Sequence, residues 1–168
     1  MFNSFKKQRK YQDLTETVKA IAAFLIDDTG SDLPTPLKEH LVPKKLDYSL
    51  ESLKHVDAYL DVIRKNRNTL TEDQLMKVIA RCGAYCGEVV RRLSKEDLYW
   101  INYDTAIVAD SRVKSFDKSL YTFYILFAEP NNFSFPLAKV GKYLDNGPED
   151  SLYFLAMMLL SPSPEKKK

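Results

Sequence analysis

Residues 81–92, RCGAYCGEVVRR, contain the side chains of this sequence whose types most resemble those of a reactive or metal-binding site. A zinc site needs about four ligands. Cys82 and Cys86 offer two, and the only imidazoles, His40 and His55, lie elsewhere without paired spacing. The thiols are also four positions apart, which is not the two-residue gap of a redox pair. We therefore expect no metal ion, no catalytic thiol and no cofactor at this segment.

The spacing of the same segment favours a packing role. Apolar residues recur at helical intervals from Leu75 to Leu93, and both cysteines fall on that stripe. A buried cysteine there acts as a small hydrophobe. The neighbouring stripe contains Gly83 and Gly87, each of which costs about 1 kcal/mol of helix stability relative to alanine. We expect another backbone, or a large aromatic ring, to approach closely at these glycines.

The opposite side of this helix is rich in charge, and three interpretations of Glu88 stay open. In the first, Glu88 lies on a solvated face in a weak pair with Arg91 or Arg92. In the second, it is drawn into the domain and holds Arg92 or a sheet residue in a buried ionic contact. In the third, it forms a functional pocket with Tyr85 and Trp100. The positions on this side are Lys77, Arg81, Ala84, Glu88, Arg91 and Lys95.

Periodicity and capping signals predict three helices in the N-terminal half. The first covers residues 16–26 and the second 50–63. Thr71 and Gln74 form a capping box that begins the third, which runs to about residue 93 and carries the segment described above. Residues 27–49 contain three prolines and are expected to be a mostly extended crossing.

Strands and two further helices are predicted in the C-terminal half. Residues 98–110 and 120–128 are rich in aromatic and β-branched side chains, which favours strands. Residues 131–136 are expected to be a loop. Pro136 suits the first turn of a helix that ends at residues 146–147, and a last helix follows over 151–160.

Together these elements predict one α+β domain over residues 1–160, with three N-terminal helices, a small antiparallel sheet and two C-terminal helices. A chain of 168 residues buries enough surface for an ordinary core. Residues 161–168, SPSPEKKK, are polar and proline-rich, and we expect them to be a disordered tail.

The bulk composition narrows the classes of function. With 25 basic and 23 acidic residues the net charge is +2, which gives no strong field for nucleic acid or an anionic membrane. The five glycines form no cluster of the kind that holds a phosphate. The longest apolar runs are far shorter than the roughly 20 residues of a spanning helix. The two cysteines cannot form a useful structural disulfide with each other, which fits a reducing compartment. We therefore expect a cytoplasmic protein.

The order of several short motifs resembles a loose group of small uncharacterised bacterial cytoplasmic proteins. The resemblance covers most of residues 47–155 and is carried by a GAYxGEVxR helix pattern. The matching stretches are MFNSFKK, DYSLESLKHVDAYL, GAYCGEVVRR, the tryptophan at position 100, and FPLAKVGKYLDNGPEDSL. In size, compartment and lack of catalytic motifs the chain is also similar to immunity proteins. That similarity implies binding to a toxin domain, and it assigns no site residue.

Two functions follow as hypotheses. The first is an intracellular protein-binding module, such as an immunity-type inhibitor that neutralises a bacterial toxin by direct binding, or a protein that forms a homodimer. Its predicted partner contacts are aromatic and charged side chains of the kind that anchor interfaces: Tyr85, Glu88, Arg91, Arg92, Trp100 and Tyr103. The alternative is a hydrolase or transferase with Glu88 as general base near Trp100 and Asp104.

Overall fold

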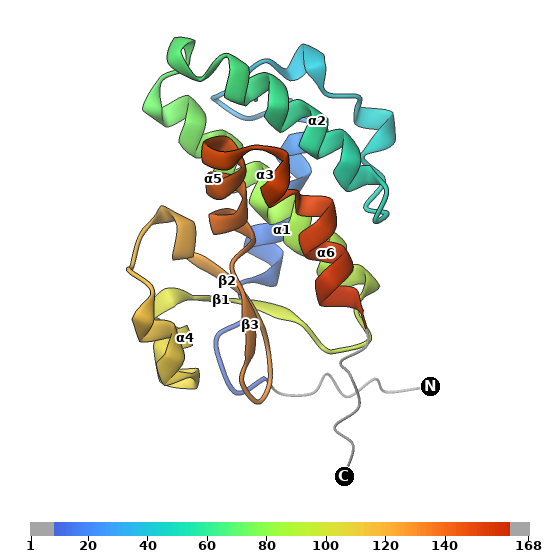
Figure 1. The fold of residues 1–168 in the computed structure, drawn as a ribbon. Coiled ribbons are helices and arrows are strands. Elements are labelled where there is room, and N and C mark those ends of the chain that lie inside the picture. Colours follow the sequence, from blue (N-terminus) through green and yellow to red (C-terminus); the bar gives the residue numbers. More distant parts are fainter. Residues whose placement is uncertain (1–8, 162–168) are drawn as a thin grey trace.

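The computed structural model describes residues 9–161, and these form an α+β fold with six α-helices and one three-stranded antiparallel sheet. Helix α3 (Glu72–Leu93) lies at the centre, and α1 (Thr15–Ile26), α5 (Pro136–Asn146) and α6 (Leu152–Leu160) pack directly against it (Figure 1). Helix α2 (Ser52–Lys65) packs on α5 and α6. The predicted fold class is confirmed.

Helix α3 begins where its capping box predicts. The Thr71 hydroxyl accepts the Gln74 backbone N–H at 3.2 Å, and the Gln74 side chain accepts the Thr71 N–H at 2.9 Å. These two bonds satisfy backbone donors that the first turn of a helix leaves without partners. Every residue from Arg81 to Val90 is buried, because neighbouring elements surround α3. The interpretation in which this side of the helix faces solvent is therefore not the one observed over residues 81–90.

The two glycines of α3 mark its closest contacts, as predicted. A β-carbon at Gly83 would lie 2.7 Å from the Leu137 Cα, so the backbone of α5 packs there. A β-carbon at Gly87 would overlap the Trp100 ring. The backbone and the aromatic ring expected from the sequence are thus both present, one at each glycine.

The sheet has strand order β1-β2-β3 and lies at one end of the helices (Figure 1). Its strands are β1 (Tyr99–Asn102), β2 (Tyr124–Ala128) and β3 (Asn132–Ser134), and Trp100 pairs with Leu126. These two side chains face the main core. The opposite face carries a second apolar cluster with Tyr99, Ile101, Ala106, Val113, Ile125 and Phe127. The sheet therefore separates two cores, as alternation along a strand allows.

Three predictions in this region are wrong. Of residues 120–128, expected to be a strand, only Tyr124–Ala128 form β2, and Leu120–Thr122 form a short 3-10 helix. Only the first part of residues 98–110 is a strand, and α4 (Tyr103–Ala109) follows it. The Asn102 side chain accepts the Thr105 backbone N–H at 2.8 Å and so caps this helix. Residues 131–136, expected to be a loop, contain β3, because a tight connection folds the chain back onto β2. Strand β3 forms because it pairs with β2, and the local composition of residues 131–136 does not indicate such pairing.

The two C-terminal helices form close to their predicted bounds. Pro136 occupies the first turn of α5, and Gly147 ends it with a φ of +93°. Ser151 caps α6 by accepting the Phe154 N–H at 3.2 Å. The predicted tail lies, apart from Ser161, outside the described residues. Among the helices of residues 9–161, none is long and apolar enough to cross a membrane.

Candidate functional site

Glu88 is fully buried at the centre of a polar network. Its Oε1 accepts a hydrogen bond from the Trp100 indole Nε1–H at 2.9 Å. Arg91 donates to both oxygens, through Nε at 2.8 Å and Nη2 at 2.9 Å. The Nε of Arg92 lies 3.6 Å from Oε2. Of the three interpretations, the buried ionic contact that holds a sheet residue is the one observed.

The position of Trp100 depends on neighbours from three segments. Its ring lies against Gly87, where any side chain would displace it. Its backbone carbonyl accepts the Leu14 N–H at 2.8 Å, and its own N–H donates to the Thr15 hydroxyl at 3.3 Å. The start of α1 thus pairs with the outer edge of β1, and this contact fixes the indole over Glu88.

The network continues from Arg92 through two stacked tyrosines. The Arg92 guanidinium lies 3.4 Å from the centre of the Tyr48 ring, which is a close cation–π contact. Tyr48 stacks on Tyr85 with ring centres 4.7 Å apart. The Tyr85 hydroxyl accepts the Tyr48 backbone N–H at 3.0 Å and donates to the Ser52 hydroxyl at 2.8 Å. Burial raises the pKa of both tyrosines, so they stay neutral donors and acceptors.

This geometry does not place Glu88 as a general base. Such a base must reach the proton of a substrate. Glu88 has no exposed surface, and three donors from Arg91 and Trp100 already point at its oxygens. Its hydrogen bonds and charge in turn raise the pKa of Arg91, so that this arginine stays charged. The carboxylate is therefore arranged to hold its neighbours in place.

The structure gathers five of the six predicted site residues and leaves one apart. Tyr85, Glu88, Arg91, Arg92 and Trp100 share the network described above. Tyr103 lies on α4 at the second core, and its hydroxyl donates to the Phe116 carbonyl at 2.5 Å. Asp104, named with the enzyme hypothesis, pairs with Lys118 at the surface. Tyr48, which no sequence pattern indicated, completes the network.

Both cysteines face the core, as their spacing predicts. Cys82 and Cys86 are fully buried and unpaired, and burial raises the pKa of each thiol far above its usual value. A thiol in that state is a poor nucleophile and a poor metal ligand. Over residues 9–161, no three side chains of the His, Cys, Asp and Glu types gather as a metal site would need.

A second feature, absent from the predicted site, is the outer side of α6. We call Phe154, Met157 and Met158 the α6 outer face. Phe154 is 57% exposed and Met158 is 72% exposed, whereas Leu152 and Ala156 on the inner side are buried. The helix sequence LYFLAMMLL contains no charged residue. An apolar helix of this kind is normally covered on all sides.

Helix α6 is fixed firmly in spite of its uncovered side. The Asp57 carboxylate of α2 accepts the Ser151 hydroxyl at 2.6 Å and the Leu152 N–H at 2.9 Å. A carboxylate at this end of a helix is favourable because the first-turn N–H groups carry partial positive charge. These bonds anchor the first turn of α6 to α2.

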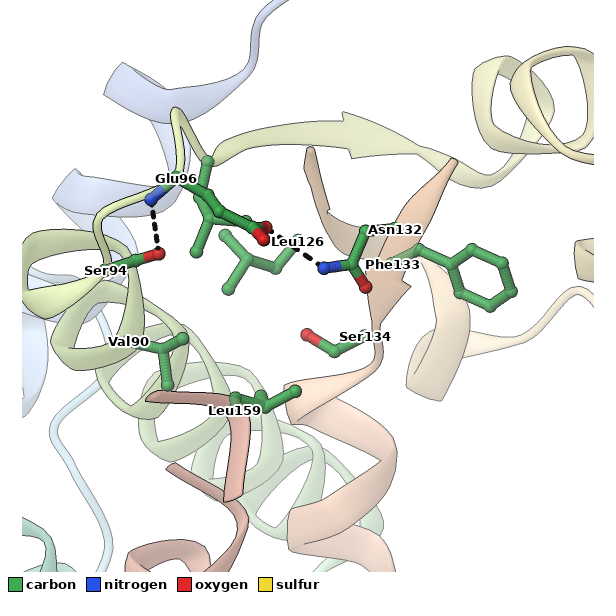
Figure 2. A pocket seen from close by; sticks show the side chains of 9 residues that line it. Val90, Ser94, Glu96, Leu126, Asn132, Phe133, Ser134 and Leu159 are labelled. Atoms are coloured by element: carbon green, nitrogen blue, oxygen red, sulfur yellow. Dashed lines mark hydrogen bonds between the residues drawn. The ribbon is translucent and has the colours of Figure 1, made fainter. Parts of the chain in front are cut away.

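A small cleft borders the other side of α6 (Figure 2). Val90, Leu126 and Leu159 form its apolar walls, from α3, β2 and α6 respectively. Glu96 and Asn132 close one end through a hydrogen bond of 3.1 Å. The cleft has a volume of about 20 Å³, which is room for about one water molecule. It is too small for an organic substrate.

Comparison of the chain with protein family models, with curated proteins and with solved structures finds no match.

Proposed function

We propose that this protein is a protein-binding module that uses the α6 outer face as its contact surface. The observation that carries the proposal is the exposure of Phe154 and Met158 on a helix without a single charged residue. Contiguous exposed apolar side chains on a folded protein mark interaction sites. Methionine suits such a surface because its flexible, polarisable side chain adapts to a partner.

The polar network supports the same proposal because its carboxylate is not accessible to a substrate. Its carboxylate is closed to substrate, and the cleft beside α6 holds about one water molecule. An enzyme needs a concave site where convergent groups meet a substrate, and neither of these two places is one. A wider cleft of about 450 Å³ lies elsewhere, at the end of α1, where the Asp28 carboxylate is already bonded to Thr35 and Lys38. A binding module needs only a complementary surface on a folded domain, and Asp57 anchors the first turn of α6 to α2.

An immunity-type inhibitor of a bacterial toxin is the form of this function that we put forward. In it, the α6 outer face packs on the toxin domain, and the bulk of the protein excludes substrate from the toxin's active site. Inhibition then comes from steric coverage and needs no reaction by the inhibitor. The other possible occupant of this face is a second copy of the chain in a homodimer. The test below distinguishes that copy from a toxin domain.

The test uses the product of the adjoining gene as a defined binding partner. Purified protein is titrated with it by isothermal calorimetry, and the oligomeric state is measured by light scattering. Met158→Asp is expected to weaken binding at least tenfold, because it places a charge in an apolar contact. Val108→Asp is the matched control, since Val108 is a similarly exposed apolar residue, at 76%, on α4.

Equal binding by both variants would contradict the proposed surface. A dimer in the wild type that Met158→Asp alone dissociates would assign the face to self-association instead. The absence of binding to any adjoining gene product, together with a monomer in solution, would remove the inhibitor form of the proposal.

A further inference from the structure

The two edges of the sheet differ in what covers them. The strand order places β1 at one edge and β3 at the other (Figure 1). At the β1 edge, the Trp100 carbonyl accepts the Leu14 N–H, and the Trp100 N–H donates to the Thr15 hydroxyl. The start of α1 therefore satisfies the outward groups of Trp100. Within residues 9–161, the backbone of β3 makes hydrogen bonds to no segment other than β2.

The register of the sheet identifies which groups of β3 face outward. In an antiparallel pair, residues that exchange hydrogen bonds with the opposite strand alternate with residues that do not. Trp100 directs its backbone groups away from β2, so its partner Leu126 directs its own groups toward β3. Leu126 pairs with Ser134, and the neighbouring Phe133 pairs with Phe127. The backbone N–H and C=O of Phe133 therefore both face away from the sheet.

This edge lies beside the end of α6. Ser134 of β3 and Leu159 of α6 line the same small cleft, and the Phe133 ring points away from it, toward the second core (Figure 2). Leu159 directly follows Met158 of the α6 outer face and is itself 37% exposed. Side chains alternate across a sheet along each strand. A strand added at β3 would thus direct alternate side chains to the side of the sheet on which α6 ends.

From these observations we infer that β3 accepts an extended segment of the protein partner as a fourth strand, paired with the backbone of Phe133. The inference rests on the proposed protein-binding function and adds the form of the partner segment. An edge strand with unpaired N–H and C=O groups is a template for another chain, and main-chain hydrogen bonds hold the added strand. On the side of α6, the segment carries apolar side chains, because Met158 and Leu159 are exposed there.

The β3 edge and the α6 outer face contribute different things to this contact. Only one residue of β3 directs its backbone outward, so antiparallel pairing adds two hydrogen bonds. Those bonds fix the register and direction of the partner segment. The α6 outer face supplies the apolar area, which hydrogen bonds at a sheet edge do not provide.

The experiment measures amide hydrogen exchange by NMR on the ¹⁵N-labelled full chain, alone and with the unlabelled product of the adjoining gene. The Phe133 amide is expected to exchange at least about tenfold more slowly in the complex, because a partner carbonyl then accepts its N–H. The Trp100 amide faces the opposite edge and should be slow in both states, since the Thr15 hydroxyl already accepts it. The Ser134 amide, which faces β2, is a second internal control.

Two variants at one position isolate the backbone donor. Phe133→Pro and Phe133→Leu both remove the aromatic ring, and only proline removes the N–H. Because this N–H faces outward, proline should leave the pairing with β2 intact, as at other sheet edges. Phe133→Pro is expected to bind the gene product about three- to tenfold more weakly than Phe133→Leu, which is the effect of one hydrogen bond. Equal Trp100 fluorescence in the two variants shows that the sheet is preserved, and if proline prevents folding, the exchange measurement decides alone.

Several results would overturn the inference. A Phe133 amide that is already slow in the free monomer would mean that the chain covers this edge by itself, and one that is slow in a free dimer would assign the edge to a second copy. Equal binding by folded Phe133→Pro and Phe133→Leu, or a complex in which Phe133 exchange is unchanged, would remove the added strand alone. The proposed function then stands wherever Met158→Asp still weakens binding. A gene product that does not bind removes both.

Discussion

The Glu88 network buries a charged side chain, and the α6 outer face exposes apolar ones. A folded chain normally does the reverse in both cases. In the network, the Glu88 carboxylate, the Tyr85 hydroxyl and the Trp100 indole are buried, and over residues 9–161 no buried side-chain nitrogen or oxygen lacks a hydrogen-bond partner. At α6, large apolar side chains are exposed to solvent on a helix that is otherwise well anchored. The two regions are joined through the first turn of α2.

The difference separates what maintains the fold from what is free to bind. Buried charge is costly unless it is paired, so removing one member of the network leaves others without partners. An exposed apolar side chain contributes little to folding, because it is not removed from water. Changes in the network should therefore alter stability, and changes on the α6 outer face should alter binding.

The largest expected effect comes from Glu88→Ala. This change leaves the Arg91 guanidinium and the Trp100 indole N–H without their acceptor in a buried site. We expect a loss of about 3–5 kcal/mol in the free energy of unfolding, measured by urea titration at pH 7. The control is Glu16→Ala, which removes a pair of the same spacing with Lys19 from an exposed helix surface. Its expected change is within about 1 kcal/mol.

Gly87→Ala should have the next largest effect. The new methyl group would overlap the Trp100 ring and push the indole away from Glu88. Overpacking of this kind costs about 1–3 kcal/mol, and better helix propensity returns about 1 kcal/mol of it. We expect a net loss of up to about 2 kcal/mol together with altered fluorescence of Trp100, the only tryptophan. A variant as stable as the wild type, with unchanged fluorescence, would show that the ring does not depend on this glycine.

The sequence predicts most helices because their signals are local. The capping box at Thr71 and Gln74, the proline at the start of α5 and the glycine at its end each act within a few residues. The small side chains at positions 83 and 87 likewise indicate a close approach without any knowledge of the neighbour. These features depend on short-range geometry, which periodicity reports directly.

The site was predicted less well because its determinants lie far apart in the chain. Glu88 is on the charged side of α3, and only the packing of α1 and the sheet against that side makes it buried. Tyr48 lies 37 residues from the Tyr85 hydroxyl that fixes it, so no spacing rule selects it. The α6 outer face was missed for another reason. A helix with apolar residues on every side gives no sign of which side stays uncovered.

A third region tests whether closed polar clusters in this protein contribute stability generally. Asp28 accepts the Thr35 N–H at 2.5 Å and also pairs with Lys38 at 3.0 Å, while Arg81 of α3 bonds the Thr35 hydroxyl. The Thr35 hydrogen bond, with Lys38, lowers the pKa of Asp28 to about 2 from its usual 3.8. A carboxylate with a lowered pKa stabilises the fold above its unfolded pKa, and that contribution is lost as the pH falls toward the folded value.

The wild type should accordingly exceed Asp28→Asn in unfolding free energy by about 1–2 kcal/mol at pH 7. The difference should shrink between pH 4 and pH 2, where Asp28 becomes protonated in both states. Urea titrations at three pH values across this range measure it. A difference that stays constant with pH would mean that the side chain acts through packing and not through its charge.

The smallest expected effect on stability is that of Met158→Asp, the same change that should weaken binding to a partner at least tenfold. Met158 is 72% exposed, so the aspartate replaces a side chain that folding leaves mostly in water. We expect the free energy of unfolding to change by no more than about 0.5 kcal/mol, as for Val108→Asp on α4. A loss above about 2 kcal/mol would show that the folded protein covers this face by itself. The loss of binding would then report damage to the fold, and the contrast between a closed network and an open contact surface would fail.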